Sequence, residues 1–187
     1  SPDILKRENI FKALHRQLSN RQIVFLTGLR RIGKTTMLRI IVQHLISEKG
    51  VAPEKILYVS LDDYLLSKYT ILEIVEKFRV IHRHRFNEHL YLLLDEITYK
   101  EHFEIQLKNL FDSHNVKIIA SSSSASLLKN KKAYLTGRNT VIEILPLDYS
   151  EYLQFKNIQI SKADSHLHKK YFEDFLSTGG IPEFVLK

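Results

Sequence analysis

The chain has 187 residues, 44% of them hydrophobic and none of them cysteine, and its 28 basic residues against 21 acidic ones give a formal charge of +7. The length suits one α/β domain with a sizeable core, and the apolar content excludes a disordered chain. Without cysteine there are no disulfides or cysteine zinc sites, and no apolar stretch approaches the roughly 18 residues that span a bilayer, so we expect a cytoplasmic protein without a membrane partner.

The first part of the chain predicts a helix, a strand and a second helix. Residues 4–18 place apolar side chains at helical spacing among basic and polar ones. Residues 22–27 are short, β-branched and aromatic and run into Gly28, which is typical of a buried parallel strand. Residues 38–46 repeat apolar side chains at i, i+3, i+4, i+7 and i+8, and a glycine and a proline end this helix.

Strands and helices then alternate up to residue 145. The patterns predict strands at 56–61, 90–94, 116–120 and 140–145, and helices at 70–83 and 102–111. Thr70 and Glu73 form a capping box at the start of the first of these helices. Alternation of this kind indicates βαβ units, so we expect an α/β fold whose five-stranded parallel sheet is covered by helices on both faces.

Only helical patterns follow Pro146, at residues 149–155 and about 165–176, before a Gly-Gly-Ile-Pro turn at 179–182. We therefore divide the chain into a core with an N-terminal helix, residues 1–147, and the beginning of a small helical lid, residues 148–187. Because the sequence lacks an initial methionine and stops just after a turn, we expect the lid to be truncated.

Residues 28–35 read Gly-Leu-Arg-Arg-Ile-Gly-Lys-Thr and match the G-x-x-x-x-G-K-[ST] pattern between a buried strand and a periodic helix. In such a loop, backbone N–H groups surround a β-phosphate and the helix N-terminus adds partial positive charge. Lys34 is expected to reach the β- and γ-phosphates, and the Thr35 hydroxyl to bind Mg²⁺. The alternative is a glycine-containing turn without a ligand. The predicted nucleotide-binding residues here are Gly28, Arg30, Arg31, Ile32, Gly33, Lys34, Thr35 and Thr36.

The strand at 90–94 ends in two carboxylates, Asp95 and Glu96. A parallel strand delivers its carboxyl end to the same edge of the sheet as the glycine-rich loop. Asp95 can then hold Mg²⁺ while Glu96 activates an attacking water as general base. Carboxylates after a strand often mark only a turn, so this prediction depends on the loop some sixty residues upstream.

Two further positions are candidates for contact with the γ-phosphate. A run of serines, 121–124, follows the next strand; Ser122 or Ser123 is predicted to sense the phosphate, and we assign Ser122. The alternative is a turn that caps the following helix. Arg138 precedes the last strand and is predicted to stabilise the transferred phosphoryl group of a neighbouring subunit, because its loop faces away from its own nucleotide. The alternative is a solvated arginine.

These motifs together resemble the AAA+ ATPases and, more narrowly, the prokaryotic ATPase family in which an AAA-type domain precedes a C-terminal domain of unknown function. The resemblance covers nearly the whole chain, and the last two segments are specific to the narrower family. It implies a P-loop NTPase three-layer sandwich with strand order 5-1-4-3-2, ATP with Mg²⁺, and a lid that places Pro182 near the adenine. The segments that carry the resemblance are residues 28–36, 58–63, 93–97, 137–138, 145–152 and 179–183.

The sequence departs from this family in two respects. Where the family has Gly-Ser after the fourth strand, this chain has Ala120-Ser121-Ser122, which leaves the register of the sensor residue open. The C-terminal domain does not follow within these residues, and with it we expect the part that selects the biological target to be missing.

We therefore predict an ATP hydrolase that acts as a switch or motor for an attached domain or partner, with Glu96, Lys34 and Arg138 as catalytic residues and Asp95 and Thr35 as metal ligands. ATP, ADP and a second copy that receives Arg138 are the expected partners. One alternative is a nucleotide-sensing module that binds DNA or protein with little hydrolysis. Another is a P-loop kinase, which requires an acceptor-binding insertion and normally lacks a water-activating glutamate.

The positive charge agrees with a nucleotide as the first partner. Residues 1–34 hold eight basic and two acidic residues, which gives a charge of +6. Residues 35–187 hold twenty basic and nineteen acidic residues, which gives a charge of +1. Three of the eight, Arg30, Arg31 and Lys34, lie in the glycine-rich loop, where a triphosphate is the nearer anion. The remainder is too small to require nucleic acid.

Overall fold

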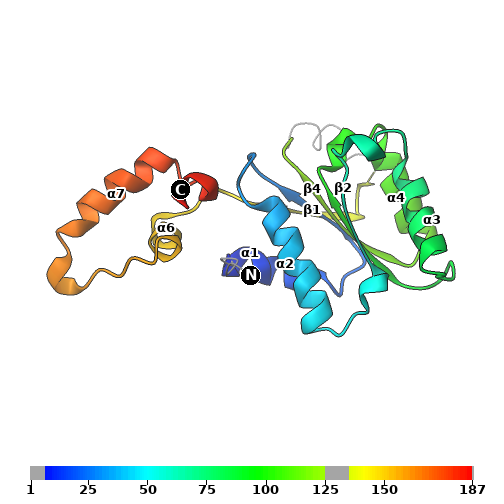
Figure 1. Cartoon of the computed structure of the whole chain (residues 1–187), viewed down its shortest axis with the longest axis horizontal. Coiled ribbons are helices and arrows are strands. Elements are labelled where there is room, and N and C mark those ends of the chain that lie inside the picture. Colours follow the sequence, from blue (N-terminus) through cyan, green and yellow to red (C-terminus); the bar gives the residue numbers. More distant parts are fainter. Residues whose placement is uncertain (1–6, 125–134, 187) are drawn as a thin grey trace.

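The computed structural model of the chain describes residues 7–124 and 135–186 and contains one five-stranded sheet (Figure 1). The strand order is β2-β3-β4-β1-β5, and every neighbouring pair is parallel. Both the parallel sheet and the order implied by the resemblance are thereby confirmed. The strands are β1 Ile23–Thr27, β2 Ile56–Ser60, β3 Leu90–Asp95, β4 Val116–Ser122 and β5 Asn139–Glu143.

Helices cover both faces of the sheet, as the βαβ pattern predicts (Figure 1). On one face, α1 and α2 enclose an apolar cluster with the sheet, and on the other α3 and α4 enclose a second. The predicted capping box opens α3, since the backbone N–H of Glu73 donates to the Thr70 hydroxyl at 3.1 Å and that of Thr70 to the Glu73 carboxylate at 2.7 Å. The helices are α1 Glu8–Gln17, α2 Lys34–Ser47, α3 Ile71–Ile81 and α4 Phe103–Ser113, with short 3₁₀ turns η1 Pro53–Lys55, η2 Tyr64–Leu66 and η3 Ile97–Tyr99.

The helices after the sheet lie to one side of it, away from α3 and α4 (Figure 1). They are α6 Tyr149–Phe155, η5 Lys162–Asp164, α7 Leu167–Thr178 and α8 Pro182–Val185. Leu147, Tyr152 and Val185 form a third apolar cluster, separate from the two that flank the sheet. In the Gly-Gly-Ile-Pro turn, a Cβ on Gly180 would lie 2.5 Å from the Leu147 carbonyl oxygen, so this close approach of two backbones requires glycine.

Arg7 joins the segment before α1 to these helices. Its guanidinium donates to both carboxylate oxygens of Glu151 on α6, at 2.9 and 2.7 Å, and also to the backbone carbonyls of Leu145 and Pro146. The side chains of Arg7 and Glu151 are 10% and 19% exposed, so this is a partly buried, bidentate ion pair. Glu151 also closes a capping box with Asp148 at the start of α6.

Most element boundaries differ from prediction by a few residues. The first helix starts at Glu8, and predicted residues 4–6 lie outside the described part of the chain. β4 continues two residues beyond the apolar pattern, to Ser122, because Leu26 and Thr27 of β1 pair with Ser121 and Ser122. Among the helices in the described ranges, none has the length and apolar content needed to cross a membrane.

Candidate functional site

The glycine-rich loop connects β1 to α2 at the carboxyl edge of the sheet. A Cβ on Gly28 would lie 2.4 Å from the Ile144 carbonyl oxygen, so the loop can pass the end of β5 only with glycine at this position. Gly33 precedes α2 in a left-handed conformation, and neither a side-chain cap nor an acidic residue covers the first turn of this helix. The N-terminus of α2 therefore offers backbone N–H groups and partial positive charge to an anion.

A cavity of about 600 Å³ lies over this loop, a size common for sites that bind small molecules. Its walls come from the loop, the start of α2, the ends of β3 and β4 and the turn that begins α8. Most of the predicted phosphate-binding residues line it, together with Glu96 and Pro182. The lining residues are Arg30, Arg31, Gly33, Lys34, Thr35, Thr36, Asp62, Glu96, Tyr99, Ser123, Pro182, Glu183 and Leu186.

Lys34 is held beneath the loop. Its Nζ donates to the carbonyl oxygens of Gly28 at 3.1 Å and Leu29 at 2.8 Å, and the residue is only 4% exposed. Burial lowers the pKa of Lys34, while the Glu96 and Asp95 carboxylates act in the opposite direction and Arg30 lowers the pKa further. The ammonium group thus lies at the cavity wall within electrostatic reach of both acidic residues.

Asp95 and Thr35 meet behind the cavity. The Thr35 hydroxyl donates to Asp95 Oδ2 at 2.6 Å, and the Asp95 side chain is almost fully buried. A carboxylate beside a hydroxyl is a donor set suited to Mg²⁺, which takes oxygen ligands and fills the remaining positions with phosphate and water. No group of three or more histidine, cysteine or acidic side chains among the described residues is placed to hold a metal by itself. The residues present therefore fit a magnesium ion bound together with a triphosphate.

The Glu96 carboxylate is fixed by Ser123. Glu96 has a left-handed backbone conformation, with φ of 52°, between the end of β3 and η3. The Ser123 hydroxyl donates to Glu96 Oε1 at 2.5 Å, and the Ser123 N–H donates to Oε2 at 3.2 Å. This pair of hydrogen bonds places the carboxylate in the wall of the cavity, across from the glycine-rich loop.

Three residues predicted to bind nucleotide do not line the cavity. Ser122 is fully buried, and its hydroxyl contacts Thr98 and the N–H of Ser124, so Ser123 and not Ser122 is the serine that reaches the cavity. Ser122 is the last residue of β4 and Ser123 lies in the bend that follows, and their hydroxyls have different partners. Ile32 is buried in the apolar cluster beneath α2, and Gly28 can contribute only backbone.

Four lining residues were not predicted from the sequence. Glu183 follows Pro182 and forms an ion pair of 3.2 Å with Arg31, which links α8 to the glycine-rich loop. Both Glu183 and Asp62 lie in segments that carry the family resemblance, residues 179–183 and 58–63, and this could have marked them as candidates. Nothing in the sequence marks Tyr99 or Leu186.

Arg138 lies at the opposite edge of the sheet. It directly precedes β5, and its Nε donates to Asp112 Oδ1 at 3.0 Å while its guanidinium carbon lies 6.0 Å from the centre of the Phe111 ring. The glycine-rich loop follows the other end of the parallel strands. Arg138 therefore does not reach the cavity of its own chain, and its action on a neighbouring subunit stays a prediction.

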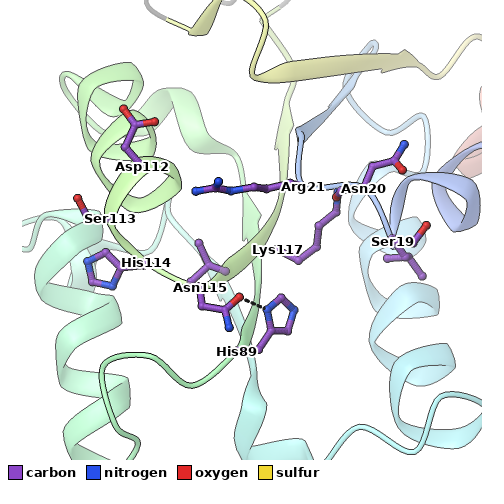
Figure 2. A pocket seen from close by; sticks show the side chains of 11 residues that line it. Ser19, Asn20, Arg21, His89, Asp112, Ser113, His114, Asn115 and Lys117 are labelled. Carbon is purple, nitrogen blue, oxygen red and sulfur yellow. Dashed lines mark hydrogen bonds between the residues drawn. The ribbon is translucent and has the colours of Figure 1, made fainter.

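A second cavity, of about 570 Å³, lies at this amino edge (Figure 2). Arg21 reaches from the start of β1 toward α4, where its Nη2 donates to the Phe111 carbonyl at 2.7 Å. Lys117, on the central strand β4, is 2% exposed, and its Nζ donates to the carbonyls of Asn20 at 2.6 Å and Gln22 at 2.7 Å. Burial lowers the pKa of Lys117 to about 8. The lysine thus holds the turn before β1 through two hydrogen bonds, although burial of its charge is unfavourable.

Lys117 is expected to make stability rise with pH above about 8. The unfolded chain holds this proton up to about pH 10.4, so between the two pKa values the unfolded state binds more protons and each rise in pH favours the folded state. Relative to Lys117→Met, the free energy of unfolding of the wild type should increase by about 2 kcal/mol between pH 7 and about pH 9.5. Denaturant titrations at several pH values measure this, with the exposed Lys49→Met as control; parallel curves for wild type and Lys117→Met would contradict it.

The chain is similar in sequence to one known protein family and to several longer proteins. The family model described as "AAA domain" matches residues 20–153. An uncharacterized protein of Methanocaldococcus jannaschii is 35% identical over 184 residues, which is 97% of this chain and 36% of that protein. An uncharacterized protein of Haemophilus influenzae is 29% identical over 190 residues, 100% of this chain and 46% of that protein. The chain thus spans between about a third and a half of the length of these relatives.

Solved structures with the same fold belong to several proteins. A chain of the Saccharomyces cerevisiae Hsp104:casein complex superposes with a TM-score of 0.60 at 19% identity, over 97% of this chain and 36% of that chain. AMPPCP-bound DnaA from Aquifex aeolicus gives 0.54 at 18% identity, over 91% and 58%. Pif1 helicase from Candida albicans gives 0.53 at 13% identity, over 82% and 44%. At these identities the likeness establishes the P-loop NTPase fold.

Proposed function

This chain belongs to the AAA domain family of P-loop ATPases, and we propose that it binds ATP with Mg²⁺ and hydrolyses it to ADP and phosphate, the lid or an attached partner responding to the change. We further propose that residues 1–147 form the ATPase core and residues 148–187 part of the lid. One observation carries the hydrolase proposal: the lysine of the phosphate loop and a positioned glutamate line one cavity, and a buried aspartate is bonded to the loop threonine that also lines it.

The loop and α2 are proposed to bind the triphosphate. Backbone N–H groups of the loop and of the first turn of α2 hold the phosphates, and Lys34 donates to the β- and γ-phosphate oxygens in place of its own loop carbonyls. Asp95 and Thr35 would hold Mg²⁺, which when bound neutralises charge on the phosphates. Arg30 and Arg31 lie at the mouth, where they offer further positive charge.

Glu96 is proposed to act as the general base. Its carboxylate accepts the proton of an attacking water as the water's oxygen bonds to the γ-phosphorus and the bond to the β–γ bridging oxygen breaks. Ser123 fixes the orientation of this carboxylate through two hydrogen bonds. Its neighbour Asp95 is bonded to Thr35, so the two acids are held for different tasks: one toward the metal, the other toward the water.

Phosphate release from ATP tests the proposed reaction. We expect the wild type to release phosphate from ATP with Mg²⁺ and not with EDTA, while binding a fluorescent ATP analogue in parallel. ATP binding without release in the presence of Mg²⁺ would favour the nucleotide-sensing alternative, and phosphate transfer to an added acceptor would favour the kinase. The same assay across protein concentration tests Arg138: specific activity that stays constant would contradict its action on a neighbouring copy.

A further inference from the structure

Ser121 connects the two acidic residues of the site. It is fully buried on β4, and its hydroxyl donates to Asp95 Oδ1. The same oxygen accepts a hydrogen bond of 2.9 Å from the backbone N–H of Glu96. A serine hydroxyl has one hydrogen to donate and lone pairs to accept, so one atom satisfies the Asp95 carboxylate and the Glu96 backbone together.

The bond to Asp95 fixes how that carboxylate is turned. With Oδ1 occupied by Ser121, Oδ2 is the oxygen that meets the Thr35 hydroxyl, at 2.6 Å. Without the Ser121 contact, Oδ1 would lose this donor and the carboxylate would be held at Oδ2, by Thr35 and by the Tyr58 hydroxyl at 3.4 Å. The contact therefore holds the second oxygen, and with it the orientation of the carboxylate beside Thr35, where the metal is proposed to bind.

The bond from Glu96 stabilises a backbone conformation that is uncommon for a residue with a side chain. Glu96 has φ of 52°, and this conformation directs its carboxylate to Ser123 at the cavity wall. The Ser121 hydroxyl accepts the hydrogen bond that the Glu96 N–H donates. Loss of that acceptor would leave a backbone donor without its partner at the point where the chain turns away from β3.

We infer that Ser121 is a positioning residue that couples the metal-binding carboxylate to the base. It touches neither the nucleotide cavity nor, by proposal, the reacting atoms, and it acts through Asp95 and Glu96. The inference rests on the roles proposed above for these two residues. Ser122 provides the contrast, because it is equally buried and adjacent in sequence but its hydroxyl contacts Thr98 and Ser124.

The test compares Ser121→Ala and Ser121→Cys with a control, Thr140→Ala, in the full chain. The Thr140 hydroxyl also makes a side-chain hydrogen bond, to Gln22 at 2.7 Å, but it lies on β5 outside the nucleotide cavity. Cysteine keeps the volume of the side chain but is a weak hydrogen-bond donor, so it separates loss of the hydroxyl from loss of packing. The first readout is the affinity for a non-hydrolysable ATP analogue at increasing Mg²⁺ concentration. The second is the hydrogen-exchange rate of the Glu96 amide by NMR. The third is kcat for ATP.

Both Ser121 variants are expected to raise the half-saturating Mg²⁺ concentration about tenfold and to lower kcat about tenfold. Hydrogen exchange of the Glu96 amide should become faster, while the affinity for the ATP analogue in EDTA should stay unchanged. Thr140→Ala should match the wild type in all of these. A Mg²⁺ response that is equal in the three variants and the wild type would overturn the inference, and so would an equal loss in Thr140→Ala. If the wild type binds Mg²⁺-ATP without turnover, the proposed hydrolysis fails, and the Mg²⁺ titration and amide exchange still decide the role of Ser121.

Discussion

Lys34→Ala is expected to weaken ATP binding by about two orders of magnitude or more. The ammonium group is the buried cation nearest to the proposed phosphates, and hydrogen bonds between charged groups contribute roughly twice as much as neutral ones. Alanine keeps the helical propensity of α2 while removing this charge. Titration of a fluorescent ATP analogue with each protein measures the effect.

Lys49→Ala is the matched control for this change. It also removes one lysine, two residues beyond the far end of α2, where the side chain is exposed and distant from the loop. The control should bind ATP like the wild type. Retention of wild-type affinity in Lys34→Ala would contradict the assignment of the loop as the phosphate site.

Glu96→Gln is expected to bind ATP like the wild type and to release phosphate at least about a hundredfold more slowly. Glutamine has the same shape and its amide oxygen still accepts from Ser123, but it cannot take a proton from water. The loss should therefore appear in kcat rather than in affinity. Single-turnover phosphate release beside equilibrium binding of ATP measures the two quantities.

Glu101→Gln tests whether loss of a negative charge alone explains the result. Glu101 is exposed and precedes α4, outside the cavity. It should keep wild-type turnover. Equal phosphate release by Glu96→Gln and the wild type would exclude Glu96 as the base.

The sequence predicted best where a motif fixes both the identity and the spacing of its residues. The glycine-rich loop needs its residues at fixed spacing between a strand and a helix, and the structure places Lys34 and Thr35 accordingly. Alternating strands and helices predicted the parallel sheet, whereas the strand order came from the family resemblance. Strand pairing depends on contacts between distant residues, which periodicity does not report.

The polar end of β4 shows where local pattern fails. Serine is a weak strand former, so the apolar run marked the end of the strand at Ala120, whereas pairing with β1 extends it to Ser122. Within β4, alternation directs the Ser121 and Ser122 side chains to opposite faces, and Ser123, in the bend after the strand, bonds to Glu96. A one-residue uncertainty in register therefore decides which serine lines the cavity: the structure places Ser123 there, and the sensing role of Ser122 stays a prediction.

Some contacts left signals that can be recognised only in hindsight. Lys117 is a lysine inside an otherwise apolar strand, a pattern that indicates either an edge strand or a buried amine with dedicated acceptors. The pair of Arg7 and Glu151 left none, because the two residues are 144 positions apart and each is ordinary in its local context.

Arg7 links α1 to α6, and α1 in turn packs against α2, the helix that follows the glycine-rich loop. One end of α1 is fastened through Arg7 to Glu151 and to the linker carbonyls, and its apolar face packs through Phe11 and Leu14 with residues of α2. A displacement of α6 must either break the Arg7 bonds or carry α1 against α2. Through α1, a movement of α6 would thus be transmitted to the helix that begins at the glycine-rich loop.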